Sequence, residues 1–578
     1  MIKALLIGIL LVAGHAFSQE VWQTIHTEHF NVHFSSENQQ WAQSAATELE
    51  IVRNKVLKQQ NRALDEVIDV VVFDPFNASN GFALPVTIKP LMALFTTPPQ
   101  SDSMIANTDS WQQLLILHEY IHLVHLAQPT RSLPRQAIRN IWDLYDLSQS
   151  DMPRWVAEGY ATLLESKMTG RGRLYDNLSE AILVEFAQQG ALPSYGQLNR
   201  TEDSYMAGSM AYLMGARFLA WLEDNYSPKT LDAVWTRMQA VKSRDFNDAF
   251  SGVLGDSPAR LYRRFIAEYT YRAMAKEVSE QTLTSELWLE LDLYASNPVL
   301  SLDNSKLAIV ERNKDDETRL VIYSTADNQQ AADDFAKQQQ QLLDNDPVDI
   351  ADKAPSVFKR KQKHVLHQIN KQGIKNPQWL DENTLFFSAT TTVGKGSIQG
   401  ISDLYRYDIE TGEISALTHH AGLRRFTISD NGQTVYAEQT RHGFSELVHF
   451  DLNTGVSTPL FEKSLETVYD YPLLSPNKTK LAYLKVALNA NWQLYIQDLN
   501  SQQSIAVPMP VGYQYVSQPN WQADGKGLYF VAGKNAALDL YHFDLNSNSL
   551  RQLTQGQEAV AHPMAMNNGE LLYLSITA

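Results

Sequence analysis

The chain is organised around one apolar stretch, LLILHEYIHLVH at residues 114–125. It contains the pattern H-E-x-x-H. On a helix the residues i and i+4 lie on one face, so His118 and His122 can present their imidazoles to a single ion. Glu119 follows directly and is placed to take a proton from water at the open position of a metal site. The stretch therefore predicts a metal-binding helix that still needs a third ligand.

The third ligand is expected from PRWVAEGYA, residues 153–161. Its proline marks a helix start, and its apolar residues form a stripe. Glu158 lies on that stripe, 36 residues after His122, which leaves room for one helix to end and a second to return. A carboxylate on a buried face is unfavourable unless a partner pairs with it, and zinc would be such a partner.

Together the two segments resemble the gluzincin metallopeptidases, which combine H-E-x-x-H with a downstream W-x-x-E-G-x-A helix. The resemblance implies an α+β metallopeptidase domain in which His118, His122 and Glu158 hold one zinc ion per chain. It also implies that Glu119 is the general base. The alternative is that these residues are satisfied core groups or the remnant of a dead site.

The resemblance implies further groups around the zinc. Gluzincins place a tyrosine or histidine over the oxyanion of the tetrahedral intermediate, and Tyr205 is the first candidate here, with Tyr212 the second. Glu165 returns to the face of Glu158 and is expected to support a ligand, or else to face solvent. In gluzincins the last strand before the zinc helix is an exposed edge that pairs with substrate, a role extended here to residues 81–95.

The other histidines of interest are not expected to bind the metal. His125 is expected to be a core or supporting residue rather than a ligand. The metzincin pattern does not fit, because its later positions are occupied by His125 and Gln128. A cluster near the N-terminus is expected to form a solvated strand face rather than a second metal site: His26, His29 and His33.

Length and composition bound the remaining possibilities. A chain of 578 residues is too long for one core, and two or three domains are expected. Its formal net charge of −17 argues against binding nucleic acid or anionic membranes. The chain has no cysteine, which excludes disulfides and cysteine-ligated zinc.

The first residues resemble an export signal. A basic start, an apolar core and a small-x-small site at residues 16–18 predict a signal peptide over residues 1–18. No later stretch approaches the ~20 apolar residues that a membrane helix needs. The prediction is an exported protein, periplasmic or secreted, without a stable membrane span.

A repeat begins near residue 287. Four hairpins end in an aspartate turn, and their aspartates are spaced 43, 47 and 46 residues apart: Asp408, Asp451, Asp498 and Asp544. Four-stranded units at this period are β-propeller blades, and the phrases resemble TolB-like propellers. We expect the aspartates to close turns rather than to bind metal.

The predicted architecture is therefore multidomain, with a metallopeptidase domain over residues 19–280 and an all-β propeller over residues 287–578. About five blades and a partial one are expected, with a polar insertion near residues 326–375 that is partly disordered or a long excursion between strands.

The predicted function is zinc-dependent hydrolysis of a peptide or protein substrate, and endopeptidase action is slightly favoured over exopeptidase action. The propeller is expected to gate substrates or to dock a partner protein. Two alternatives stay open. One is a propeller-based binding or scaffold protein whose zinc site is structural or degenerate. The other is a zinc hydrolase of a non-peptide amide.

Overall fold

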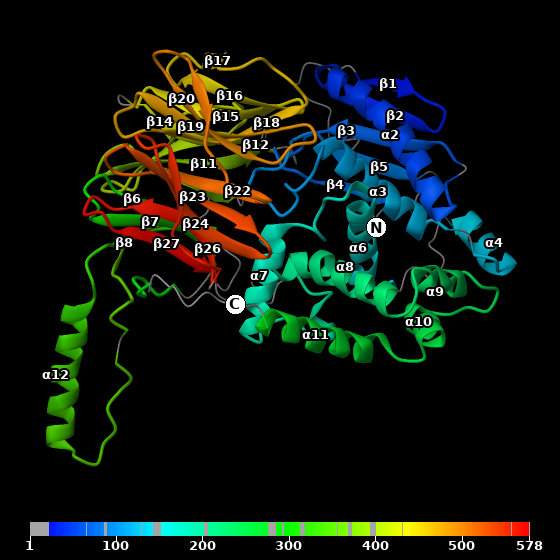
Figure 1. Ribbon diagram of the computed structural model, residues 1–578, viewed down its shortest axis with the longest axis horizontal. Helices are drawn as coiled ribbons and strands as arrows, with labels where there is room; N and C mark the ends of the chain where they lie inside the picture. The colour runs from blue at the N-terminus through cyan, green and yellow to red at the C-terminus, as the bar shows by residue number, and fades with distance from the viewer. Residues whose placement is uncertain are drawn as a thin grey trace.

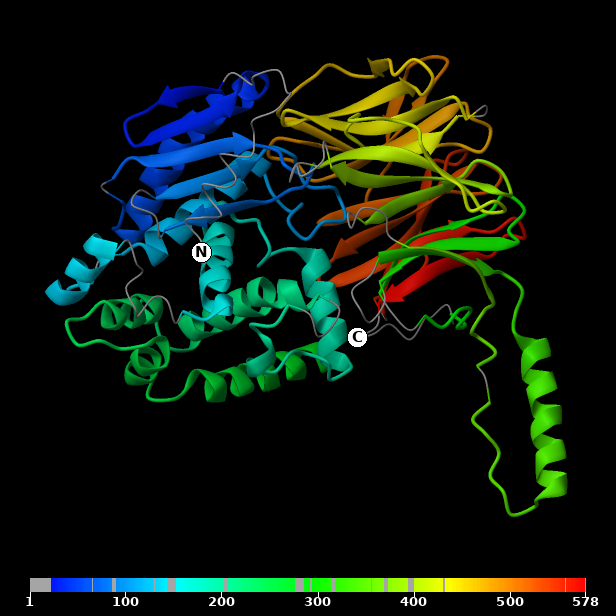
Figure 2. The same ribbon diagram turned by 180° about the vertical axis from the view of Figure 1, so that it is seen from behind.

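A computed structural model describes most of the chain: residues 22–64, 66–85, 90–128, 130–142, 152–201, 206–275, 285–291, 294–312, 318–354, 356–367, 373–392, 400–429, 432–556 and 558–576. The predicted signal peptide lies outside these residues. An N-terminal α+β part and a C-terminal propeller lie side by side (Figures 1 and 2). No helix among the described residues is long and apolar enough to cross a bilayer.

The N-terminal part is built on a five-stranded sheet in the order β1-β2-β3-β5-β4. The inner strands β2, β3 and β5 run parallel, whereas β1 and β4 pair antiparallel at the two edges. The strands are β1 (Trp22–His26), β2 (Phe30–Ser35), β3 (Ile68–Phe73), β4 (Gly81–Leu84) and β5 (Leu91–Phe95). Of the two strands within residues 81–95, only β4 is an edge strand. The substrate-pairing role expected for residues 81–95 is wrong for β5, which lies between β3 and β4.

Helices pack on this sheet and extend beyond it. They are α2 (Gln39–Gln60), α3 (Trp111–Leu126), α4 (Leu133–Trp142), α6 (Arg154–Thr169), α7 (Asn177–Gln188), α8 (Ala207–Asn225), α9 (Thr230–Met238), α10 (Phe246–Leu254) and α11 (Pro258–Met274), with short 3-10 turns η1 (Ser36–Asn38) and η2 (Tyr195–Gln197). The stretch that opened the sequence analysis forms α3, and its residues Leu114 to His125 are all buried. The Ser110 side chain caps this helix by accepting from the Gln113 amide.

Helices α6 and α8 cross at two glycines. A Cβ on Gly159 would lie 2.6 Å from the Gly215 carbonyl carbon, and a Cβ on Gly215 would lie 2.5 Å from the Trp155 oxygen. Only glycine allows the two backbones to approach this closely. The contact sets the depth of α6 in the domain, and therefore the position of Glu158.

Among its described residues, the propeller contains five four-stranded sheets and one two-stranded sheet. The first three are β6 (Ala295–Leu300), β7 (Lys306–Arg312), β8 (Thr318–Ser324) and β9 (Gln362–His367); β10 (Ile374–Trp379), β11 (Thr384–Thr392), β12 (Gly400–Asp408) and β13 (Ile414–Ala416); and β14 (Leu423–Ile428), β15 (Thr434–Arg441), β16 (Phe444–Asp451) and β17 (Ser457–Pro459). The others are β18 (Thr467–Leu474), β19 (Lys480–Ala487), β20 (Gln493–Asp498) and β21 (Ser504–Ala506); β22 (Tyr515–Trp521), β23 (Gly527–Lys534), β24 (Ala537–Asp544) and β25 (Ser549–Gln552); and β26 (Ala559–Ala565) with β27 (Leu571–Ile576).

The innermost strands close into a ring, because β26 contacts β22 on one side and β6 on the other. The aspartate turns form as predicted. Asp451, for example, accepts from the amides of Asn453 and Thr454.

The innermost strand of every blade carries a bulge at the same position. In five blades the bulge is a residue with positive φ followed by proline, which cannot donate to the sheet ladder. These residues are Asn297, Asn376, Tyr471, Gln518 and His562. The blade of β14 is the exception, and its bulge is formed by Arg424 and Arg425.

The polar segment expected as an insertion over residues 326–375 is shorter than predicted. It contains helix α12 (Gln329–Asn345), which lies between β8 and β9 in the chain and projects away from the rest of the molecule (Figures 1 and 2). Strand β9 and the first residues of β10 also fall inside the expected range. Both belong to blades, and neither shows a clear alternation of apolar and polar residues: β9 reads QKHVLH and β10 reads IKNPQW.

Candidate active site

Three predicted ligands converge at one point between α3 and α6. His118 Nε2 lies 3.1 Å from His122 Nε2. Glu158 Oε2 lies 3.6 Å from His118 Nε2 and 3.1 Å from His122 Nε2. Within the described residues, this is the one group of three histidine, aspartate or glutamate side chains whose ligand atoms lie close enough to share an ion.

The spacing of these atoms fits a zinc ion. Nitrogen and oxygen ligands lie about 2.0–2.2 Å from zinc in a tetrahedral site, which places the ligand atoms roughly 3.3–3.6 Å from one another. The separation between His118 and Glu158, 3.6 Å, lies at the upper end of that range, and the other two, both 3.1 Å, lie about 0.2 Å below it. Two imidazoles and one carboxylate are also the donor set of several catalytic zinc sites, where the fourth position is left for water or substrate.

Glu165 and Arg173 orient His118. The Nδ1 of His118 lies 2.6 Å from Glu165 Oε2, and Arg173 holds the same carboxylate through Nε at 3.0 Å and Nη2 at 2.9 Å. Arg173 Nη2 also lies 2.9 Å from His118 Nδ1, but a guanidinium cannot accept a proton. The Nδ1 proton therefore goes to Glu165, and the Nε2 lone pair faces the cluster.

The charges around the cluster favour a cation. Burial and Arg173 act to lower the pKa of His118, but Glu165 and Glu158 outweigh them and raise that pKa to about 9. Burial acts to raise the pKa of Glu158, yet its hydrogen bonds with His118 and His122 hold it far below the ordinary range. A metal ion would therefore replace a proton at this position.

Glu119 lies beside the cluster on the wall of a cleft. Burial raises the pKa of its carboxyl group, although the charges of His118 and His122 act to lower it. A Cβ on Gly81 of strand β4 would lie 3.2 Å from Glu119 Oε1 and 2.6 Å from Leu115. The carboxylate is thus close to the exposed sheet edge, and a base with a raised pKa is suited to proton transfer near neutral pH.

The cleft has a volume of about 240 Å³. Its walls come from β4, α3, α6 and α8, and from the segment between β5 and α3. Besides the residues above, it is lined by Phe82, Ile105, Trp111, Arg173 and Tyr212. Tyr212 stacks on His118 with ring centroids 6.1 Å apart, and Arg173 lies over the tyrosine ring.

The remaining predicted residues fall in different places. Tyr205, the first candidate for the oxyanion, lies outside the described residues, whereas Tyr212 lines the cleft. Glu165 is fully buried against His118, so the solvent-exposed alternative is wrong. His125 packs between Tyr160 and Trp235 and does not join the cluster.

The N-terminal histidines have protein partners. His26 bonds to Asn31, His29 to Glu50, and His33 to Thr24. They form no metal-binding group within the described part of the chain.

Arg173 was not anticipated from the sequence, where residues 170–173 indicate only a loop. The available signal was indirect. A glutamate seven residues after Glu158 lies on the same buried helix face, and a buried carboxylate needs a cation. The nearest arginines in sequence follow in that loop.

Comparison with known proteins gave limited matches, and no family model matches the chain. The chain is 28% identical over 154 residues to Dipeptidyl-peptidase 5 of Porphyromonas gingivalis, covering 24% of this chain and 22% of that protein. The chain thus matches only about a fifth of the length of that curated relative.

Two solved structures resemble the chain weakly. TolB from Acinetobacter baumannii has a TM-score of 0.32 and 14% identity, covering 55% of this chain and 68% of that one. An acylaminoacyl peptidase of Pyrococcus horikoshii has a TM-score of 0.31 and 14% identity, covering 49% of this chain and 42% of that one.

These findings correct the predicted membership in the gluzincin family. The curated relative that the chain matches is named a dipeptidyl-peptidase, and no family model supports the assignment. A five-residue motif and one further carboxylate specify a local arrangement of side chains, which unrelated folds can share. The convergence of His118, His122 and Glu158 is a property of the structure and does not depend on the family assignment.

Proposed function

We propose that this chain hydrolyses peptide bonds with one zinc ion held by His118, His122 and Glu158, and with Glu119 as the proton-transfer group. The observation that carries the proposal is the convergence of the three ligand atoms beside Glu119 on the wall of one cleft. A purely structural metal site has no need of a base next to it, which argues against the scaffold alternative.

The residues of the chain divide the work. When bound, zinc would polarise the scissile carbonyl and acidify water. Glu119 accepts a proton from the attacking water and returns it to the leaving amine. Glu165, fixed by Arg173, keeps the Nδ1 proton of His118 in place, so that Nε2 stays free as a ligand.

The substrate class is supported by two observations. Strand β4 is an edge strand that lines the cleft, and an extended peptide can pair with such an edge through its backbone. The curated relative is named a dipeptidyl-peptidase, and its partial match favours a peptide over another amide. A protein partner on the propeller, and export to the periplasm, remain predictions.

The first test combines metal content with hydrolysis of a mixed peptide library. We expect about one zinc per chain in the wild-type protein and a loss of zinc in Glu158→Ala. Glu119→Gln should keep its zinc and lose hydrolysis by roughly 10²–10⁴-fold. A wild-type protein without zinc would overturn the proposal.

Parallel substrates separate the alternatives. Zinc without peptide cleavage, together with cleavage of amide-bearing glycans, would favour the non-peptide hydrolase. Peptides blocked at both termini, compared with the same peptides unblocked, test whether the enzyme is the predicted endopeptidase. Equal cleavage of both sets is expected for an endopeptidase.

A further inference from the structure

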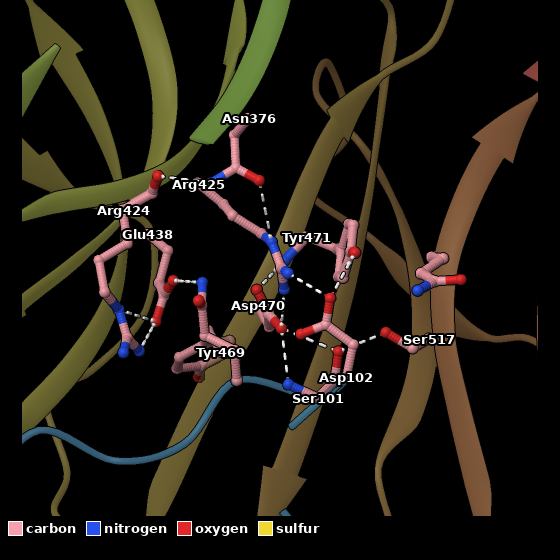
Figure 3. Close-up of polar contacts among 12 residues, drawn as sticks. Ser101, Asp102, Asn376, Arg424, Arg425, Glu438, Tyr469, Asp470, Tyr471 and Ser517 are labelled. Carbon is pink, nitrogen blue, oxygen red and sulfur yellow. Dashed lines mark hydrogen bonds and ion pairs between the residues drawn. The ribbon is translucent and has the colours of Figure 1, made fainter. Parts of the chain in front are cut away.

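A segment of the N-terminal part enters the centre of the propeller. It joins β5 to α3, and its residues 98–103 lie among the innermost strands of the blades (Figure 3). We call residues 98–103 the plug. In Figure 3 its blue trace reaches Ser101 and Asp102, which lie near Asp470, Arg425 and Ser517.

The plug bonds to several blades at once. The amide and hydroxyl of Ser101 donate to Asp470 Oδ2 of β18 at 2.7 and 2.8 Å. The Ser101 hydroxyl also lies 2.7 Å from that of Ser517 on β22. A six-residue segment that contacts the innermost strands of separate blades must lie near the axis where those strands converge.

The two arginines of the β14 bulge hold the plug by charge. Arg425 pairs with Asp102 through Nη2 and with Asp470 through Nη1 at 2.6 Å, and its guanidinium lies 3.7 Å from the centre of the Tyr471 ring. Arg424 pairs with Glu438 and donates to the Pro98 carbonyl at 3.1 Å. The blade that lacks the usual proline bulge therefore supplies both arginines that bind the plug.

Release of the plug would be costly. Arg424, Arg425, Glu438 and Asp470 are all buried. Withdrawing Asp102 would remove one of the two carboxylates paired with the buried Arg425, and a buried donor left without its acceptor is unfavourable. Withdrawing the Ser101 amide and hydroxyl would remove donors from the buried Asp470.

The same segment also builds the cleft. Ile105 follows the plug and lines the cleft, and Trp111 at the start of α3 lines it too. The plug thus fixes one wall of the candidate active site to the propeller.

We propose that the plug permanently blocks the propeller axis, so that substrates reach the cleft from the side, along β4, and not through the propeller. The propeller is then a fixed support for the cleft wall and not an entrance tunnel. The presence of the plug is independent of the proposed function, whereas the route of substrates rests on it.

The test uses a disulfide between plug and blade. The chain has no cysteine, so Ser101→Cys combined with Ser517→Cys creates a unique pair. Their hydroxyl oxygens lie 2.7 Å apart, which is compatible with the ~2.05 Å sulfur–sulfur bond of a disulfide. With oxidised glutathione as the oxidant that accepts the two electrons, we expect complete cross-linking in the full-length protein, seen by mass spectrometry and thiol titration. Each single variant should keep a free thiol.

Hydrolysis then tests the route. The oxidised double variant should cleave the peptide library as fast as its reduced form. A loss of activity on oxidation that reductant restores would show that the plug must move, and would overturn the permanent block. If the wild-type protein cleaves no peptide, the proposed function fails and the plug is judged by its cross-link alone.

Hydrogen exchange on the wild-type protein gives a check that needs no variant. The Ser101 amide, bonded to buried Asp470, should exchange as slowly as the amides of β18. Exchange of residues 98–103 as fast as that of exposed turns would overturn the proposal, as would failure of a folded double variant to cross-link.

Discussion

At the scale of single residues, the candidate site depends on the carboxylate behind His118. Glu165→Gln keeps an acceptor for the Nδ1 proton but leaves Arg173 without its charge partner. We expect zinc affinity to fall by roughly 10- to 100-fold, as for other groups that orient metal ligands. Competition with a zinc chelator measures this, and Glu223→Gln, which removes a carboxylate paired with Lys167, is the control. Unchanged affinity would contradict the orienting role.

The same carboxylate makes stability depend on pH in a defined direction. Although burial acts to raise the pKa of Glu165, Arg173 and His118 lower it from the ordinary 4.5 to about 2. Its stabilisation is therefore present above 4.5 and is lost as the pH falls toward 2. In the metal-free protein, the difference in free energy of unfolding between wild type and Glu165→Gln should shrink as the pH falls below 4.5. Urea titrations at several pH values measure it, and a constant difference would refute it.

At the scale of elements, the crossing of α6 and α8 sets where Glu158 lies. Gly215→Ala would place a Cβ 2.5 Å from the Trp155 oxygen and push the helices apart. We expect a loss of about 1–3 kcal/mol in the free energy of unfolding, as for other overpacked contacts, together with weaker zinc binding. Gly208→Ala is the matched control on α8, because nothing lies within 4 Å of its added Cβ. Equal effects of the two variants would disprove the close approach.

Also at this scale, the features predicted correctly from the sequence are those that the spacing of nearby residues determines. The i and i+4 histidines, the Glu158 helix and the aspartate turns all follow from contacts between near neighbours in the chain. The edge strand was predicted over all of residues 81–95, but only β4 is at the edge. Strand order depends on contacts between distant segments, which no local sequence pattern encodes. The bulges do have a signal in the sequence, because a residue followed by proline recurs once in five of the blades. The pairs are Asn297-Pro298, Asn376-Pro377, Tyr471-Pro472, Gln518-Pro519 and His562-Pro563.

At the scale of the whole molecule, Asp102 links the two parts. Asp102→Ala should lower the free energy of unfolding by roughly 1–3 kcal/mol, because it removes one of the two carboxylates paired with the buried Arg425 and leaves the Nη2 group without that acceptor. We also expect calorimetry to resolve separate transitions for the two parts. Asp232→Ala removes a carboxylate from the longer, more exposed pair with Arg62 and should change stability by less than about 1 kcal/mol. A single unshifted transition in Asp102→Ala would contradict the link.

The plug also escaped prediction for a physical reason. Its partners Arg425, Asp470 and Ser517 belong to strands that a one-dimensional pattern can place in blades, but not beside residues 98–103. An aspartate and a serine in a polar loop are typical of a solvated turn. Only the closed ring of blades buries Ser101 and partly buries Asp102.

The plug has a consequence for how the chain is made. Ser101 is separated from Asp470 by 369 residues and from Ser517 by 416. A ribosome adds roughly 5–20 residues per second, so about 20–80 s pass between synthesis of the plug and of its last partner. Until β14 is made, 326 residues after Pro98, the segment has none of its partners on the blades, although helices α3 to α11 have already been synthesised. A protein truncated before β22 would keep Arg425 and Asp470 but would lose Ser517 and the closed ring of blades around the segment.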